Sequence, residues 1–134
     1  MTMQILAALL LALAQAPERP AAPTDWSSVP EVAYTSQVGM NERITLPVIE
    51  MERRRQCRFD EVSPGTRGVS IDSLLLIGPG GELLDIVPED HRCTRLESYV
   101  ERLYRRHLPG HLQGPGGNAP AWYRITTAFS WNGN

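Results

Sequence analysis

Two cysteines are the residues of this sequence with the clearest capacity for chemistry. Cys57 and Cys93 are its only cysteines, and neither has the CxxC partner that is typical of a thiolate metal site. In an oxidising compartment the two would form one disulfide, and closing that loop would stabilise the fold by about 3 to 4 kcal/mol. The alternative is two separate buried thiols, which requires a reducing compartment. We predict the disulfide.

The histidines and carboxylates do not form a recognisable catalytic or metal pattern. His107 and His111 have the i, i+4 spacing of a helical metal pair, but Pro109 and Gly110 break the helix that would align them. His91 stands alone, no Ser-His-Asp arrangement is evident, and the carboxylates are scattered over predicted turns and strand faces. We therefore predict no catalytic residue, no metal ligand and no cofactor.

Length and charge restrict the classes of partner. The chain has 134 residues and a formal net charge of −2, so it has room for one small domain and no bulk positive charge. This balance argues against a nucleic-acid binder, because such proteins concentrate Lys and Arg. We expect that bulk charge does not select the partner.

The N-terminus resembles a secretory signal. An apolar run from Ile5 to Ala14 ends in the small-x-small triplet Ala14-Gln15-Ala16, which predicts a signal peptide over residues 1–16. The run is shorter than the roughly twenty residues of a transmembrane helix, so no stable membrane span is expected after cleavage. Because no Lys or Arg precedes the run, an uncleaved inner-membrane anchor is the alternative. We expect a periplasmic or secreted protein.

A Pro- and Ala-rich stretch separates this segment from the rest of the chain. Residues 17–31 predict an extended linker, since prolines neither continue a helix nor donate to a sheet. Residues 32–134 are then a single domain. Its first part has a weak pattern, and the best candidate there is a short strand over Arg43–Leu46.

The run from Pro47 to Cys57 is dense in helix formers and predicts a short helix, with the proline in its first turn. Arginines at its end invite a phosphate or anionic-lipid interpretation. We favour a solvated face, because cations near a helix C-terminus already complement the helix dipole. These arginines are Arg53, Arg54, Arg55 and Arg58.

Two apolar runs, Val69–Ile77 and Glu82–Val87, flank a Gly-Pro-Gly-Gly turn and predict a β-hairpin. The turn lacks the Lys-Ser/Thr that follows a phosphate-binding loop. Thr94 is a predicted N-cap, with Glu97 completing a capping box, for an amphipathic helix that must stop near Leu108.

The final strand has the clearest period-two pattern in the sequence. Apolar and aromatic side chains at Tyr123, Ile125 and Phe129 alternate with polar or small ones. The elements together predict an α+β fold, in which a small antiparallel sheet of about three strands packs against one long helix, with a shorter helix before it. The predicted core residues are Ile71, Leu75, Leu84, Ile86, Leu96, Val100, Leu103, Tyr123, Ile125 and Phe129.

This order of elements resembles the C-terminal domain of the TonB family of energy transducers. The resemblance rests on Val69–Ile77, on Gly80–Val87, on the helix Leu96–Leu108 with Pro109, and on Gly117–Pro120 followed by the strand Ala121–Phe129. The Tyr-Pro dipeptide that usually precedes the family's first helix is missing, and Leu46-Pro47 stands near its place. In place of the family's membrane anchor and long Pro-rich spacer, we expect the cleavable signal and the short linker described above.

The resemblance implies a domain that contacts other proteins of the cell envelope, such as an outer-membrane receptor or transporter, by pairing an extra strand to a sheet edge. We expect that edge to be the final strand, at Trp122, Arg124, Thr126 and Ala128. Without the family's anchor, an adaptor is a better hypothesis than an energy transducer. The alternatives are a small periplasmic structural or inhibitory protein and, with less support, a small exported enzyme.

Overall fold

The computed structural model describes residues 19–133. Its elements are η1 (Trp26–Ser28), η2 (Glu42–Thr45), α2 (Leu46–Arg53), β1 (Asp60–Ser63), β2 (Thr66–Ile77), β3 (Leu83–Pro88), α3 (Thr94–His107) and β4 (Ala121–Asn132). The predicted signal peptide, residues 1–16, lies outside the described residues. Within them, no helix has the length and apolar character needed to cross a membrane.

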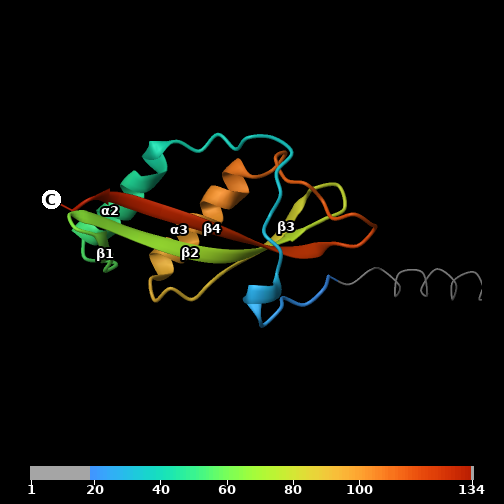
Figure 1. The fold of residues 1–134 in the computed structure, drawn as a ribbon, viewed down its shortest axis with the longest axis horizontal. Helices are drawn as coiled ribbons and strands as arrows, with labels where there is room; N and C mark the ends of the chain where they lie inside the picture. Colours follow the sequence, from blue (N-terminus) through green and yellow to red (C-terminus); the bar gives the residue numbers. More distant parts are fainter. Residues whose placement is uncertain (1–18, 134) are drawn as a thin grey trace, which may run out of the picture.

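β2 is the central strand of a four-stranded antiparallel sheet (Figure 1). On one side it pairs with β4 along its whole length, from Thr66 opposite Asn132 to Ile77 opposite Ala121. On the other side its first residues pair with β1 and its last with β3. The sheet is therefore three strands wide at either end, with β4 along one side.

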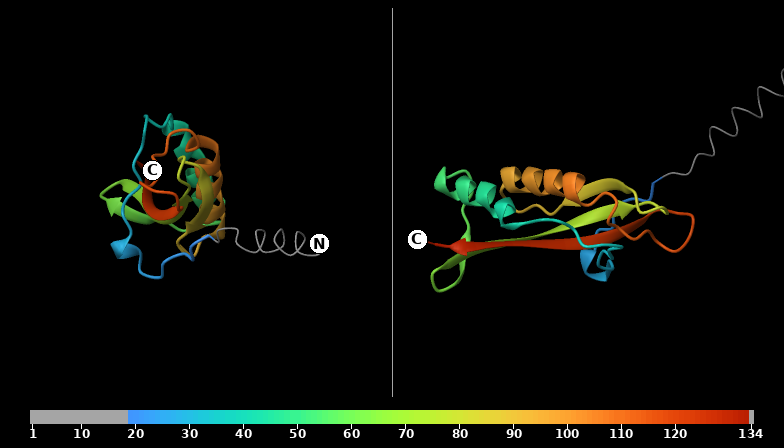
Figure 2. Two further views of the ribbon diagram at one scale, coloured as in Figure 1. Left: turned by 90° about the vertical axis from the view of Figure 1, so that its right-hand side faces the viewer. Right: turned by 90° about the horizontal axis from the view of Figure 1, so that it is seen from above.

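The helices α2 and α3 cover one face of this sheet (Figure 2). The apolar stripe of α3 meets the apolar side chains of β2 and β4, and removing both from water drives the packing. Of the predicted core residues, eight are buried in one cluster: Ile71, Leu75, Ile86, Leu96, Val100, Leu103, Ile125 and Phe129. Tyr123 is half-buried against it. Leu84 is half-buried outside it, at the register shift between β2 and β3.

Part of the opposite face of the sheet is covered by the N-terminal segment, residues 19–32 (Figure 2), whereas Ser70, Thr126 and Ala128 remain exposed. Leu74 and Leu76 of β2 point to this face and are fully buried. Val29 of the segment is also buried, and Arg19 donates from Nη1 to the Leu84 carbonyl at 3.0 Å. The described part of the predicted linker is thus packed on the domain, because removing Leu74 and Leu76 of β2 from water is favourable.

The structure corrects several predicted elements. The sheet has four strands rather than about three, because Asp60–Ser63 adds β1. The first helix ends at Arg53 rather than Cys57, and Arg55 beyond it has a φ of +58°. The strand expected over residues 43–46 is wrong: Asn41 accepts a hydrogen bond from the Arg43 amide and starts η2 instead.

The start of α3 also differs from the prediction. Cys93, with an extended backbone, is the N-cap, and Thr94 is the first helical residue. The cap makes no side-chain hydrogen bond, so the predicted capping box is absent at this helix. The helix ends as predicted, with Leu108 as its C-cap.

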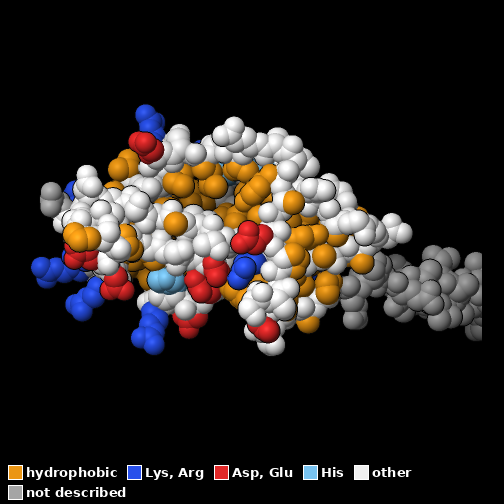
Figure 3. All heavy atoms as spheres, viewed as in Figure 1, with side chains coloured by type: hydrophobic (Ala, Val, Ile, Leu, Met, Phe, Trp, Pro, Cys, Tyr) orange, Lys and Arg blue, Asp and Glu red, His pale blue; other side chains and the backbone are white. Residues whose placement is uncertain are grey.

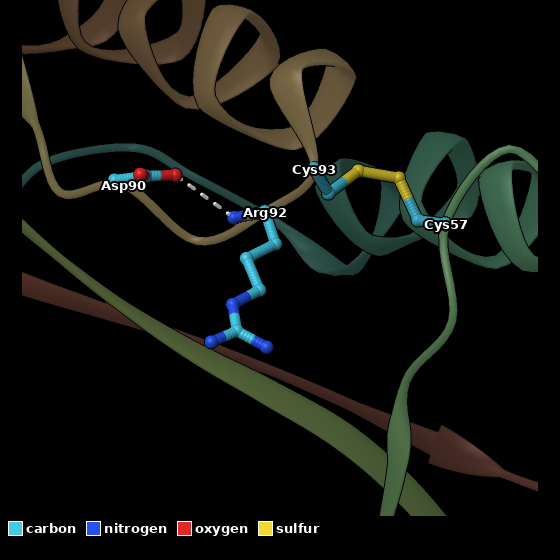
Figure 4. The surroundings of a disulfide bond; sticks show 4 residues. All are labelled: Cys57, Asp90, Arg92 and Cys93. Atoms are coloured by element: carbon cyan, nitrogen blue, oxygen red, sulfur yellow. Dashed lines mark hydrogen bonds between the residues drawn. A yellow bond between two sulfur atoms is a disulfide. The ribbon is translucent and has the colours of Figure 1, made fainter.

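Cys57 and Cys93 are joined in a disulfide, and their Cα atoms lie 5.7 Å apart. Figure 4 shows that the bond ties the chain after α2 to the first turn of α3. Arg92, next to the bond, has a φ of +62°, and its amide donates to Asp90 Oδ1 at 3.2 Å. The disulfide therefore fixes the two helices on their shared face of the sheet.

Replacing both cysteines with alanine should lower the free energy of unfolding by about 3 to 4 kcal/mol, because a loop with a sequence separation of 36 is released in the unfolded chain. Urea unfolding of the oxidised protein measures this loss. Reduced wild type should lose the same amount, and the double variant should not respond to reductant. Equal midpoints for the variant and the oxidised wild type would contradict the stabilising role.

Candidate functional site

The outer edge of β4 is the candidate site. The backbone N–H and C=O of Arg124 point away from β2. The amide donates to the Pro30 carbonyl and the carbonyl accepts from the Val32 amide, both at 2.9 Å. Backbone groups alternate in direction along a strand, so those of Thr126, Ala128 and Ser130 also point away from β2. Within residues 19–133 these groups have no backbone partner. We call this stretch the open edge.

The structure divides the predicted partner-binding residues into two pairs. Thr126 and Ala128 are exposed on the open edge. Trp122 and Arg124 are not available, because the N-terminal segment occupies their part of the strand. The Trp122 indole donates to the Pro20 carbonyl at 3.0 Å, and Arg124 Nη2 lies 3.8 Å from Glu31 Oε1.

The open edge has none of the residues that usually prevent strand pairing. Natural edges are commonly blocked by Lys, Pro or inward charges, whereas Thr126, Ala128 and Ser130 are small and uncharged. The Thr126 hydroxyl is held by the Asp72 carboxylate on the neighbouring strand. From Thr126 to Asn132 the edge could pair with an extended segment of about six residues, at roughly 3.3 Å per residue.

Apolar side chains lie beside this edge on the helix side of the sheet. Figure 3 shows them in a hollow between β4 and the segment that leads to α2. The Tyr99 and Phe129 rings have centroids 6.2 Å apart, and the Tyr99 hydroxyl donates to the Ile44 carbonyl. A strand added to β4 would direct every second side chain toward this hollow.

A buried polar pair lies beneath the middle of β4. Tyr104 of α3 is fully buried, and its hydroxyl is hydrogen-bonded to that of Thr127. Burial raises the pKa of Tyr104 to about 12, while the hydrogen bond to Thr127 acts in the opposite direction. The phenol is therefore neutral at ordinary pH and has a structural role, holding α3 against β4.

The remaining serine and histidine groups form one close pair and one contact with a backbone carbonyl. Ser36 Oγ and His111 Nδ1 lie 2.8 Å apart although they are 75 residues apart in sequence, a proximity that spacing alone did not reveal. His91 Nε2 contacts the Ser70 carbonyl at 3.2 Å. Among the described residues there is no group of three or more His, Cys, Asp or Glu side chains suited to a metal ion.

Comparison of the chain with protein-family models found no match, and searches of curated proteins and of solved structures also found none. The site therefore has to be interpreted from its own geometry.

The direction of the backbone groups can be tested by amide hydrogen exchange. The amides of Arg124, Thr127 and Phe129 should exchange at least about a hundredfold more slowly than those of Ala128 and Ser130, because only the first three are paired. Residue-resolved NMR exchange measures this pattern. Equal protection along β4 would show that the edge is already covered.

Replacing Tyr104 with phenylalanine should cost about 1 kcal/mol at neutral pH, because it leaves the Thr127 hydroxyl unpaired. In wild type, the unfolded chain releases the phenol proton near pH 10 and the folded protein only near 12. Stability should therefore fall by about 2 to 3 kcal/mol as pH rises across this range. Urea unfolding at each pH should show a smaller fall for Y104F than for wild type, and an equal fall in both proteins would contradict the role of Tyr104.

Proposed function

We propose that this protein is exported to the cell envelope and binds an extended segment of a partner protein by strand addition at the open edge of β4. The observation that carries the proposal is an unprotected run of outward backbone groups at Thr126, Ala128 and Ser130. Main-chain hydrogen bonds would supply affinity, and the adjacent apolar hollow would select the partner's side chains. The disulfide supports export, since such bonds persist in oxidising compartments.

The resemblance to the TonB C-terminal domain suggests an outer-membrane transporter or receptor as the partner. An adaptor suits the chain better than an energy transducer. Arg19 and Pro20 bond to the sheet, so these residues of the predicted linker are held on the domain and are not an extended tether. The adaptor hypothesis needs only binding.

The variant Ala128→Pro tests the proposal. Proline removes an N–H that points away from β2, so the ladder between β2 and β4 keeps its hydrogen bonds while the open edge loses a donor. Immobilised wild type should capture an outer-membrane transporter from detergent-solubilised envelope, and A128P should capture about tenfold less or none. Quantitative mass spectrometry of the captured protein measures the difference.

Ala119→Pro is the matched control, because Ala119 is exposed in the loop before β4. It should capture as wild type does, and both variants should show the wild-type thermal unfolding midpoint within a few degrees. Capture of the same transporter by A128P and wild type would refute strand addition at this edge. A soluble hydrolase as the sole captured protein would instead favour the inhibitory alternative.

A further inference from the structure

A cleft between α3 and the chain that leads into α2 has a composition that the open edge does not explain. Its volume is about 530 Å³, and it is separate from the outward backbone of β4. Its basic lining comes from Arg43, Arg102, Arg106 and His107, and no carboxylate lines it. We call it the arginine cleft.

The three arginines of this cleft differ from those that pair with a carboxylate. Arg54 and Arg105 each have a carboxylate oxygen within 3 Å. Within residues 19–133, none of the three guanidinium groups of the arginine cleft forms an ion pair. Three exposed arginines without an ion pair thus line one cleft of a chain whose net charge is −2.

Two neighbouring clefts include a carboxylate. Glu50 lines the cleft between α2 and the start of α3, which shares Arg102 with the arginine cleft, and Glu52 lines the cleft beside the disulfide, which also holds several arginines. The helix dipole accounts for Arg106 in the last turn of α3. It does not account for Arg43, which comes from η2 and lines the same cleft.

Apart from Gly39 and Asn41, the rest of the lining is apolar. Leu103 is buried, and Ile44 and Tyr99 are half-buried. The hydrogen bond from the Tyr99 hydroxyl to the Ile44 carbonyl joins the two walls. The cleft therefore offers guanidinium groups together with an apolar surface.

We propose that the arginine cleft binds a phosphate monoester that carries an apolar body. A carboxylate has two oxygens and is satisfied by one bidentate arginine, whereas three guanidinium groups match the larger acceptor capacity of a phosphate. The apolar body would lie on Leu103, Ile44 and Tyr99. Such a group occurs both in soluble phosphate esters and in lipid headgroups, and the experiment distinguishes these sources.

Calorimetric titration of the oxidised protein with hexyl phosphate tests the proposal, with hexanoate and inorganic phosphate as comparison probes. Hexyl phosphate should bind at least about tenfold more tightly than either, because only it uses both parts of the cleft. In NMR spectra its addition should shift the Arg102 and Arg106 side-chain signals and the amides of residues 39–44. Shifts centred on Arg55, Arg58 and Arg92 would place the anion elsewhere and overturn the proposal.

The variants are R43Q and the double variant R102Q/R106Q, each of which should weaken binding of hexyl phosphate by about tenfold or more. R105Q is the control, because Arg105 lies on the same helix but is paired with Glu101, and it should bind within about twofold of wild type. R43Q removes no ion pair or hydrogen bond of the fold, so its loss of binding cannot be assigned to unfolding. Equal loss in R105Q, or equal affinity for hexanoate, would refute a specific phosphate site.

Flotation with phosphatidylcholine vesicles, with and without phosphatidic acid, distinguishes the two sources. Binding only to vesicles with phosphatidic acid, and competition by hexyl phosphate, would identify a lipid headgroup. Binding of hexyl phosphate without flotation would identify a soluble ester. Failure of both hexyl phosphate and the vesicles to bind would overturn the proposal.

Discussion

The hydrogen-bonded pairing of β2 with β4 determines which side chains of β4 face the helices and which of its backbone groups face outward. Because the pairing runs without interruption from Thr66 opposite Asn132 to Ile77 opposite Ala121, the alternation of β4 is fixed over its whole length. One set of side chains must face α3, and one set of backbone groups must face outward. Burial of Ile125 and Phe129 stabilises this register, since a slip of one residue would expose both.

Two further features, the disulfide and the N-terminal segment, stabilise the packing on the two faces of the sheet. The disulfide holds the end of α2 and the start of α3 together, so that both helices remain on one face of the sheet. The N-terminal segment covers Leu74 and Leu76 on the other face. A sheet packed under two helices on one face and partly covered on the other is expected to be rigid, and a rigid sheet presents its remaining backbone groups with little loss of entropy on binding.

The parts of the fold that could be predicted are those with strong local patterns. The long strands, the amphipathic helix that ends at Leu108 and the pairing of the two cysteines follow from periodicity, a Pro-Gly stop and elimination. β1 escaped prediction because its four side chains are all exposed and give no hydrophobic pattern. The pairing of Pro30–Val32 with Arg124 and the meeting of Arg43 with α3 are contacts between distant residues, and no local signal encodes them. The contacts that the N-terminal segment makes with Trp122 and Arg124 were therefore not foreseen, and neither was the arginine cleft.

The parallel bridge between Glu31 and Arg124 fixes where a strand added to β4 could start. Because the N-terminal segment already pairs with Arg124, an added strand could form its first pair only beyond residue 124. The register of such a strand would then be set by this protein and not by the sequence of the added segment. An added segment that extends past Arg124 would have to leave the sheet, because the N-terminal segment occupies that position. The position of this bridge thereby limits how many residues of the added strand can pair with β4.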